Sequence, residues 1–338
     1  MSKKRELSLI KGNSFELHYW FDDNSHTMDA IVENRCDHEI LSLIKEISNA
    51  LHYEIIIETE PITNGGLRRL LKIALKIENK KATIVSAIIL ALLSGIIITP
   101  ITTSISEVTK KIIEKAFEDS EFKELAKEKL RLEVKKLKQE TDAFIQKVDS
   151  NNVIKKRRSN FYETLQSYPK VQEVSFTIQN DDGQNINEPK IVKRKKFKSF
   201  ILVSDELEPT EIDNATIEII SPVLKKGKFR WMGIYNSEPI PFNMQSKEFK
   251  TLIQSGKIEF KNGSSIDCFL KIKKKIDNEG NEKIIGYDVE RVNKYFENDK
   301  PVETFEGKFH RHKLEGDKKQ LKMNIPDELS EAKKAKKK

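Results

Sequence analysis

The first part of the chain alternates between strand-like and helix-like spacing of its apolar residues. Aromatic and apolar side chains crowd the segment Phe15–Phe21, which is typical of a strand, and a second such run lies at Tyr53–Glu58. Between them, apolar residues recur every three or four positions over Met28–Leu51, which predicts a helix. The glycine pair Gly65-Gly66 precedes a short basic helix expected over residues 67–75. The pattern predicts a small α/β domain over residues 1–79, with a β-α-β start.

The middle of the chain holds a long uncharged stretch. From Ala82 to Ser106 there are 25 residues without a charge, most of them Ile, Leu, Val or Ala. A helix needs about 20 predominantly apolar residues to cross a hydrocarbon core, so this length predicts a transmembrane helix over residues 80–106. Lysines flank the stretch on both sides, which leaves its orientation open and keeps a re-entrant hairpin as an alternative. A buried central helix of a soluble protein is the third interpretation.

Small side chains recur every fourth residue within this stretch, which places them on one stripe of a helix. Such a stripe lets two helices approach closely in lipid and predicts self-association, although small residues are common enough in spans to arise by chance. Hydroxyl residues follow Pro100, which kinks or ends the helix, and they fit a pore mouth or an interfacial cap. The candidate oligomer and pore residues are Thr83, Ala87, Ala91, Gly95, Thr99, Thr102, Thr103 and Ser106.

Residues 107–158 predict a long amphipathic helical connector. Its apolar residues from Leu130 to Val148 alternate in steps of four and three, which fits packing onto a neighbouring subunit or a neighbouring helix. Residues 159–325 contain short alternating runs separated by turn residues, which predicts a basic, β-rich barrel or sandwich domain. The composition of residues 326–338 predicts a disordered basic tail. The expected fold class is therefore α+β: a small N-terminal α/β domain, one transmembrane helix, a long amphipathic helix and a β-rich C-terminal domain.

The composition indicates the charge of a binding partner and limits the kinds of catalytic and metal site that we expect. Lysine and arginine total 61 against 53 acidic residues, a formal net charge of +8, which favours nucleic acid, nucleotide or acidic lipid, or reflects a generally lysine-rich sequence. The two cysteines lie far apart and have no neighbouring cysteine, so neither a disulfide framework nor a zinc site is indicated. No P-loop, GxGxxG, GxSxG or HExxH motif is present. We expect no catalytic residues, no metal site, no cofactor and no enzymatic activity.

Two clusters in the C-terminal half combine cations with aromatic rings. Lysine and arginine neutralise phosphates and aromatic rings stack on bases, so this pairing predicts binding of single-stranded nucleic acid or a short oligonucleotide. An ordinary solvated strand face gives a similar alternation of lysine with apolar residues. The candidate ligand-binding residues are Lys193, Arg194, Lys195, Lys196, Lys198, Lys225, Lys226, Lys228, Arg230 and Trp231.

In layout, with its apolar stretch at Ala82 to Ser106 between two flanking domains, the chain resembles the membrane-channel effectors of bacterial anti-phage defence, in particular the effector of the Hailong system. The resemblance implies a homo-oligomer, a tetramer, in the cell inner membrane. It also implies a nucleotide or short DNA oligomer, made by a partner nucleotidyltransferase, that holds the ion channel closed. Loss of that ligand would open the channel and arrest the infected cell.

Two interpretations from other functional classes stay open. A membrane-anchored nuclease-like enzyme would use the N-terminal domain, with Asp29 and Glu33 as candidate acids, but it lacks a clustered acidic motif. A soluble oligomeric scaffold would bury the apolar helix in its core.

Overall fold

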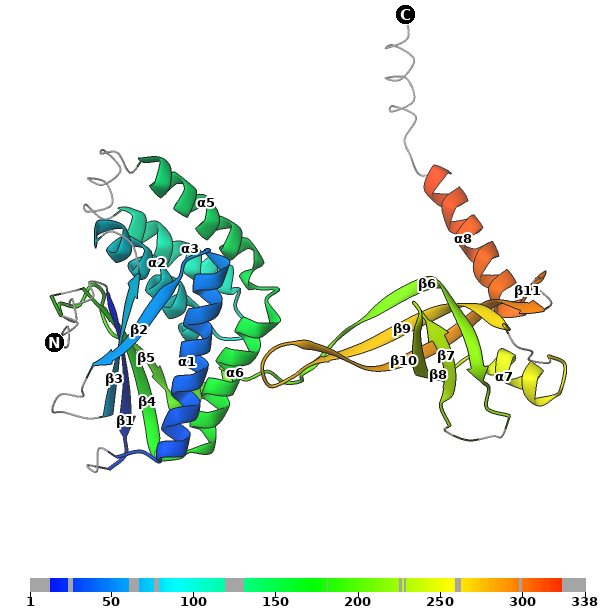
Figure 1. Cartoon of the computed structure of the whole chain (residues 1–338), viewed down its shortest axis with the longest axis horizontal. Helices are drawn as coiled ribbons and strands as arrows, with labels where there is room; N and C mark the ends of the chain where they lie inside the picture. The colour runs from blue at the N-terminus through cyan, green and yellow to red at the C-terminus, as the bar shows by residue number, and fades with distance from the viewer. Residues whose placement is uncertain are drawn as a thin grey trace, which may run out of the picture. The chain divides into compact units, whose positions relative to one another are not determined.

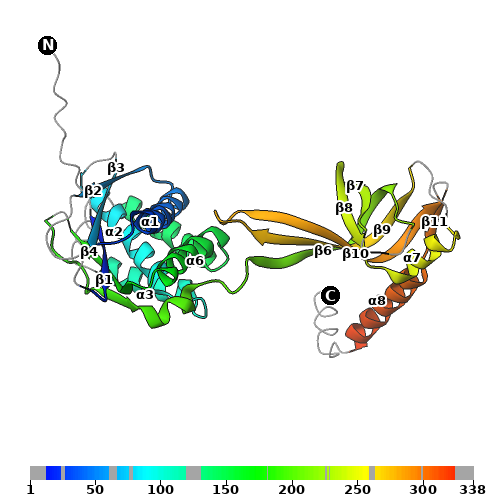
Figure 2. The ribbon, with the colours of Figure 1, turned by 90° about the horizontal axis from the view of Figure 1, so that it is seen from below.

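The computed structural model of the chain forms two compact units (Figures 1 and 2). Unit 1 comprises residues 1–205 and 276–281, and unit 2 comprises residues 206–275 and 282–338. Within them the structure describes residues 13–23, 27–60, 67–75, 79–118, 131–180, 182–224, 227, 229–258, 263–297 and 300–323. The units divide after Asp205, so the first strand expected in the C-terminal domain, near residues 173–178, belongs to unit 1 instead.

Unit 1 is built on a five-stranded antiparallel sheet. Its strands run in the order β2-β3-β1-β4-β5. They are β1 (Ser14–Phe21), β2 (Ile55–Glu60), β3 (Leu67–Leu75), β4 (Val171–Gln179) and β5 (Lys190–Lys193). Strand β1 lies between β3 and β4, and helices separate β1 from β2 and β3 from β4 along the chain. This is the order of a ferredoxin-like, split β-α-β sheet with an extra edge strand.

The described helices of unit 1 lie on one face of this sheet (Figures 1 and 2). They are α1 (Ala30–Ala50), α2 (Asn79–Ile98), α3 (Ile105–Glu118), α5 (Arg131–Val148) and α6 (Asn152–Ser167), with the 3-10 segment η1 (Arg194–Phe200). Alternate residues of β1, namely Phe15, Leu17 and Tyr19, point into the core beneath them and are at most 1% exposed. The single helix expected over residues 107–158 is thus divided, and residues 119–130 lie outside the described part.

The apolar stretch forms α2, a helix buried in the core of unit 1. It packs against α1, α3, α6 and strands β3 and β4. Leu90, Leu92 and Ile96 are fully buried, as are their neighbours on other sides of the helix. An all-round apolar surface is what a helix needs when protein surrounds it, and a lipid-facing helix shows the same composition. The buried central helix is therefore the interpretation that the structure supports.

The predicted transmembrane helix or re-entrant hairpin at residues 80–106 is wrong. Across the described ranges, none of the helices combines enough length with enough apolar character to span a bilayer. Helix α2 ends at Ile98, and residues 99–104 form a turn before α3 begins at Ile105. The expected uninterrupted span therefore divides into a core helix, a turn and the first residues of an amphipathic helix.

One further local prediction is wrong in unit 1. The basic helix expected over residues 67–75 is strand β3, which pairs with β1 on one side and β2 on the other. Leu71, Ile73 and Leu75 lie two residues apart and are buried, which is the period of a strand. The four leucines and the isoleucine of β3 also fit helical spacing, so pairing with β1 and β2 decided the outcome.

Unit 2 is a barrel of five strands followed by a helix. Strand β6 (Glu206–Ser221) pairs with β7 (Trp231–Tyr235), β7 with β8 (Glu238–Met244), and β8 in parallel with β10 (Glu282–Glu297). Strand β9 (Ser265–Ile276) pairs with both β10 and β6, which closes the ring. Helix α7 (Lys247–Gln254) connects β8 to β9, and β11 (Lys300–Glu303) and α8 (Phe305–Met323) follow. This connectivity is that of an OB-fold.

The barrel interior holds the aromatic core of unit 2. Trp231, Phe242 and Phe249 pack with ring centroids about 6 Å apart, and each is at most 2% exposed. Gly233 lies on the inner side of β7, where a Cβ atom would come within 2.6 Å of the Ile217 side chain. The strand pairing across this position therefore requires glycine, because overpacking in a closed barrel cannot relax outward.

Candidate functional site

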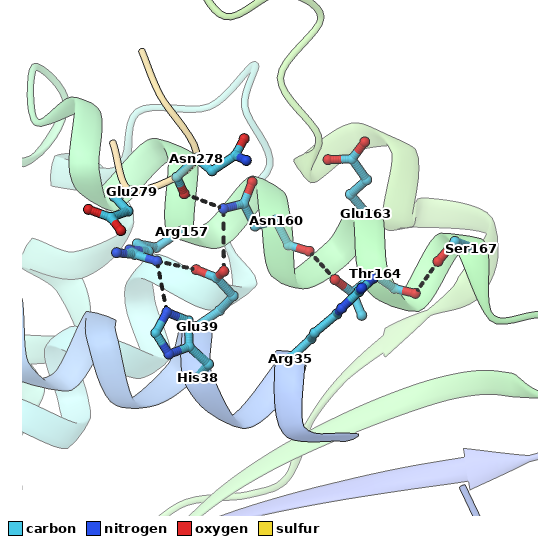
Figure 3. A pocket seen from close by; sticks show the side chains of 10 residues that line it. All are labelled: Arg35, His38, Glu39, Arg157, Asn160, Glu163, Thr164, Ser167, Asn278 and Glu279. Atoms are coloured by element: carbon cyan, nitrogen blue, oxygen red, sulfur yellow. Dashed lines mark hydrogen bonds and ion pairs between the residues drawn. The ribbon is translucent and has the colours of Figure 1, made fainter. Parts of the chain in front are cut away.

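One hollow lies in unit 1, between α1 and α6 (Figure 3). Its volume is about 550 Å³. It is lined by Arg35, His38, Glu39, Arg157, Asn160, Glu163, Thr164, Ser167, Asn278 and Glu279. The lining residues of α6 follow steps of three and four, so they form one stripe of that helix. The turn at residues 278–279, which belongs to unit 1, completes the wall.

Charge in this hollow is balanced by contacts within the protein. Arg157 contacts Nε2 of His38 at 3.2 Å and the carboxylate of Glu39 at 3.3 Å. Asn160 donates to the same carboxylate and to the carbonyl oxygen of Asn278. Altogether two arginines face three glutamates in the lining. A polyanion gains no net attraction there, because the carboxylates offset the guanidinium groups.

The second hollow lies in unit 2, between α7 and the segment that joins β6 to β7. Its volume is about 350 Å³, within the range of about 300–1,000 Å³ that is common for small-ligand sites. It is lined by Val223, Gly227, Phe229, Trp231, Lys247, Lys250, Thr251 and Gln254. The ring of Phe229 is 61% exposed, whereas Trp231 is buried and belongs to the barrel core. We call this hollow the barrel pocket.

Helix α7 presents its polar stripe to the barrel pocket. Ser246 caps the helix, because its hydroxyl accepts a hydrogen bond from the backbone N–H of Phe249 at 3.1 Å. Phe249 and Ile253, one turn apart, are buried in the core. The four residues that line the pocket, Lys247, Lys250, Thr251 and Gln254, lie three or four positions apart on the other side. Because the apolar stripe of α7 is buried in the core, its polar stripe faces the barrel pocket.

Contacts with α8 hold α7 in place. The carboxylate of Glu248 accepts hydrogen bonds from the backbone N–H groups of Phe305 and Glu306 at 2.9 and 2.8 Å. These groups begin α8, and a carboxylate is favourable at a helix N-terminus. Ser246 donates its hydroxyl proton to Glu306 at 2.7 Å. The lysines of the pocket thus lie on a helix whose N-terminal end is held by hydrogen bonds to α8.

The barrel pocket is cationic without internal compensation. Among the residues that the structure describes, its lining contains two lysines and no acidic residue. Lysines on the barrel strands differ: Lys271 contacts Glu290 and Glu211, whose hydrogen bonds raise the pKa of Lys271, and Lys273 contacts Asp288 at 2.6 Å. Lys271 and Lys273 on the barrel strands are therefore paired with carboxylates, whereas the described lining of the barrel pocket offers its two lysines no such partner.

The predicted ligand-binding residues are divided between the two units. Lys193 to Lys198 lie on β5 and η1 of unit 1, and Arg230 and Trp231 lie at the start of β7 in unit 2. Lys225, Lys226 and Lys228 lie outside the described residues. Arg230 is exposed next to the barrel pocket, and Trp231 packs into the core.

Arg194 has a structural contact that the sequence did not indicate. Its guanidinium donates hydrogen bonds to the carbonyl oxygens of Leu165, Gln166, Tyr168 and Val171, at 2.6–3.1 Å. The first two are among the last carbonyls of α6, which lack partners within the helix. Arg194 therefore caps α6, and Lys195, Lys196 and Lys198 remain exposed beside it.

Sequence reasoning missed Lys247 and Lys250 as site residues. The signal was present, because Lys247, Lys250, Thr251 and Gln254 recur at helical spacing after the capping residue Ser246. Phe229 lies between the candidate residues Lys228 and Arg230 in the sequence, but it was not itself predicted as a ligand-binding residue. The sequence did not indicate that α7 packs beside residues 223–231, because this contact forms only in the folded barrel.

The predicted oligomer and pore residues make contacts within one chain. A Cβ atom at Gly95 would come within 2.8 Å of Oγ1 of Thr109, so this glycine allows α2 to approach α3. Thr99 donates its hydroxyl to the carbonyl oxygen of Gly95. Thr83, Ala87 and Ala91 lie on the same helix, Thr102 and Thr103 are exposed in the turn that follows, and Ser106 contacts Asp149. Their roles in an oligomer or a pore stay predictions.

The acids proposed for the nuclease interpretation have structural partners. Asp29 caps α1, since its carboxylate accepts hydrogen bonds from the N–H groups of Ile31 and Val32. Glu33 forms an ion pair with Arg69 at 3.1 Å. Throughout the described ranges, no three His, Cys, Asp or Glu side chains gather in a way that could hold a metal ion.

Comparison with known proteins adds no assignment. No protein family, no curated protein and no solved structure matches the chain.

Proposed function

We propose that unit 2 binds single-stranded oligonucleotide at the barrel pocket. The observation that carries the proposal is the pairing of an exposed ring, Phe229, with two lysines that no acidic residue in the described lining compensates. OB-folds bind oligonucleotides and oligosaccharides next to the loop between their first two strands, which here are β6 and β7. Lysines favour the phosphate-bearing ligand of these two classes.

Each pocket residue has a defined part in this binding. One base stacks on the Phe229 ring, which contributes about 1–3 kcal/mol per base whatever its identity. Lys247 and Lys250 neutralise phosphates on either side of that base, and Arg230 extends the cationic surface at the start of β7. The site offers no set of base-edge donors and acceptors among its lining side chains beyond Thr251 and Gln254. We therefore expect weak sequence preference and strong salt dependence.

The experiment is a binding titration of the full chain with a fluorescently labelled oligothymidylate, read by anisotropy. Phe229→Ala should weaken binding by about 1–3 kcal/mol. Lys313→Ala, which removes an exposed cation of α8, is the matched control and should bind as the wild type does. A duplex of the same length should bind more weakly, because its bases are stacked already. Equal affinity of Phe229→Ala and wild type would refute the site.

The wider role implied by the layout stays a prediction. An anti-phage effector that responds to a short DNA oligomer would use the barrel pocket as its sensing site. The homo-oligomer, the partner nucleotidyltransferase and the inner-membrane location stay predictions as well. A titration with oligonucleotides of different length separates a sensor of short oligomers, whose affinity stops rising once the pocket is filled, from a protein that coats long single strands.

A further inference from the structure

The face of the unit 1 sheet opposite the described helices carries an exposed tryptophan. Trp20 lies on β1, and 46% of its surface is exposed. Large aromatic side chains contribute much of the free energy of burial in protein cores and interfaces. An exposed tryptophan on a polar strand face is therefore a candidate binding residue. On the strands of this sheet, the other exposed large apolar side chain is that of Ile191 on β5.

Two contacts hold the Trp20 ring in a fixed orientation. Its indole N–H donates a hydrogen bond to Oγ of Ser175 on β4 at 3.1 Å. One side of the ring stacks on His18, with centroids 4.0 Å apart and an interplanar angle of 26°. A ring that is already ordered loses little conformational entropy when a ligand stacks on its open side. The geometry is that of a preformed stacking platform.

Cations flank this platform on the strands at either side, β3 and β5. Trp20 pairs across the strands with Glu173, and Glu173 pairs with Lys193 of β5. On the other side, His18 pairs with Arg68 of β3. Because directly paired residues project from the same face, all these side chains share the open face. Three more exposed lysines, Lys195, Lys196 and Lys198, follow at the β5 edge.

By the same register this face carries Glu16, Glu58 and Glu173 as well as Lys72, so its charges are balanced and stacking on Trp20, not net attraction, carries the binding. Lys193 contacts Glu173 at 3.5 Å and is 60% exposed, and Arg68 contacts Glu16 at 4.0 Å. Exposed ion pairs at such distances contribute little to stability, so exchanging a carboxylate for a phosphate costs little. The alternative occupant, a protein partner, needs about 800 Å² of contact on each side, whereas two isolated apolar side chains provide only a small patch.

We propose that the open face of the unit 1 sheet is a second binding surface for single-stranded nucleic acid, on which a base stacks on Trp20 and phosphates contact Arg68 and Lys193. The ligand class is that proposed for the barrel pocket, but the residues belong to a different unit and the observations are separate. The chain would therefore present one stacking platform on each unit.

Tryptophan fluorescence tests this surface directly. The chain has two tryptophans, and Trp231 is 2% exposed, so an oligothymidylate that stacks on unit 1 should quench the emission of Trp20. In Trp20→Phe this part of the quenching should disappear while the ring still stacks. Trp20→Leu should weaken binding about 5- to 150-fold, the equivalent of one lost base stack. Thermal unfolding of both variants checks that the sheet is intact.

The barrel pocket and the open face are separated by combining variants. In Phe229→Ala the Trp20 quenching should persist, because the platform of unit 1 is unchanged. Wild-type binding with no Trp20 quenching, or equal affinities of Trp20→Leu and Trp20→Phe, would overturn the second surface and leave the barrel pocket standing. Quenching of Trp20 with no effect of Phe229→Ala on affinity would overturn the barrel pocket and leave the second surface standing. Association of the chain through this face, without any response to oligonucleotide, would overturn both proposals.

Discussion

The guanidinium of Arg158 donates a hydrogen bond to the carbonyl oxygen of Thr99 at 2.7 Å, at the end of α2. One turn further along α6, the hydroxyl of Tyr162 donates to the carbonyl oxygen of Ile97 at 2.9 Å. The last carbonyls of a helix have no partner within it, and these two are buried. Side chains of α6 therefore complete the C-terminal end of α2 inside the protein, as a core helix requires.

Replacing Arg158 should destabilise unit 1. Burial lowers the pKa of Arg158 to about 10, so the guanidinium is still charged at neutral pH. Arg158→Met should lower the free energy of unfolding by about 1.5–3 kcal/mol, because a charged donor is lost and a buried carbonyl is left unpaired. Chemical denaturation measures this change. Lys110→Met, on the exposed side of α3, is the control, and a similar small effect of both substitutions would contradict the capping role.

The contact between Gly95 and Thr109 predicts an effect of side-chain size. Gly95→Ala places a Cβ atom 2.8 Å from Oγ1 and 3.2 Å from Cα of Thr109, so it should cost about 1–3 kcal/mol by overpacking. Thr109→Gly in the same chain should recover part of this loss. The measurement is a double-mutant cycle of unfolding free energies at two protein concentrations. Additive effects of the two substitutions, or a cost that varies with concentration, would argue against a contact within one chain.

Asp149 should make stability depend on pH. Burial alone raises the pKa of Asp149, but hydrogen bonds from the hydroxyls of Ser104 and Ser106 and from the N–H groups of Ile105 and Ser106 outweigh it and lower this pKa. A carboxyl whose folded pKa is depressed contributes stability above its unfolded pKa, about 3.9, and loses it as pH falls through the folded value. Asp149→Ala should cost about 1 kcal/mol at neutral pH, as helix caps do, and progressively less below pH 4.

Urea denaturation at several pH values measures the Asp149 effect. Asp142→Ala, an exposed acid on α5, is the matched control and should show no such pH-dependent difference from wild type. A difference between Asp149→Ala and wild type that stays constant down to the acid transition would show that the carboxylate charge is not what holds the start of α3.

How far the sequence predicts this fold depends on whether local spacing decides the structure. The helix at α1 follows from its spacing alone, because one stripe is apolar. Helix α2 was predicted as a helix, but its surroundings were not. An apolar helix has the same composition in lipid and in a protein core, and the partners that distinguish the two, Arg158 and Tyr162, lie about 60 residues further on.

The candidate sites show the same limit. The cationic and aromatic composition of residues 225–231 was visible in the sequence, but Trp231 turned inward because β7 closes the barrel and exposes alternate residues. Arg194 was read as a ligand residue and instead caps α6, since no local pattern indicates a contact with carbonyls 23 to 29 residues away. Lys247 and Lys250 become site residues only through the packing of α7.

The salt dependence of oligonucleotide binding tests the central claim most directly. For single strands, the logarithm of the binding constant falls against the logarithm of salt concentration with a slope of about −0.7 per neutralised phosphate. If Lys247 and Lys250 each contact one phosphate, the double substitution Lys247→Ala/Lys250→Ala should make this slope shallower by about 1.4 and weaken binding at low salt. An unchanged slope and affinity, with binding intact, would show that the barrel pocket is not where the strand binds.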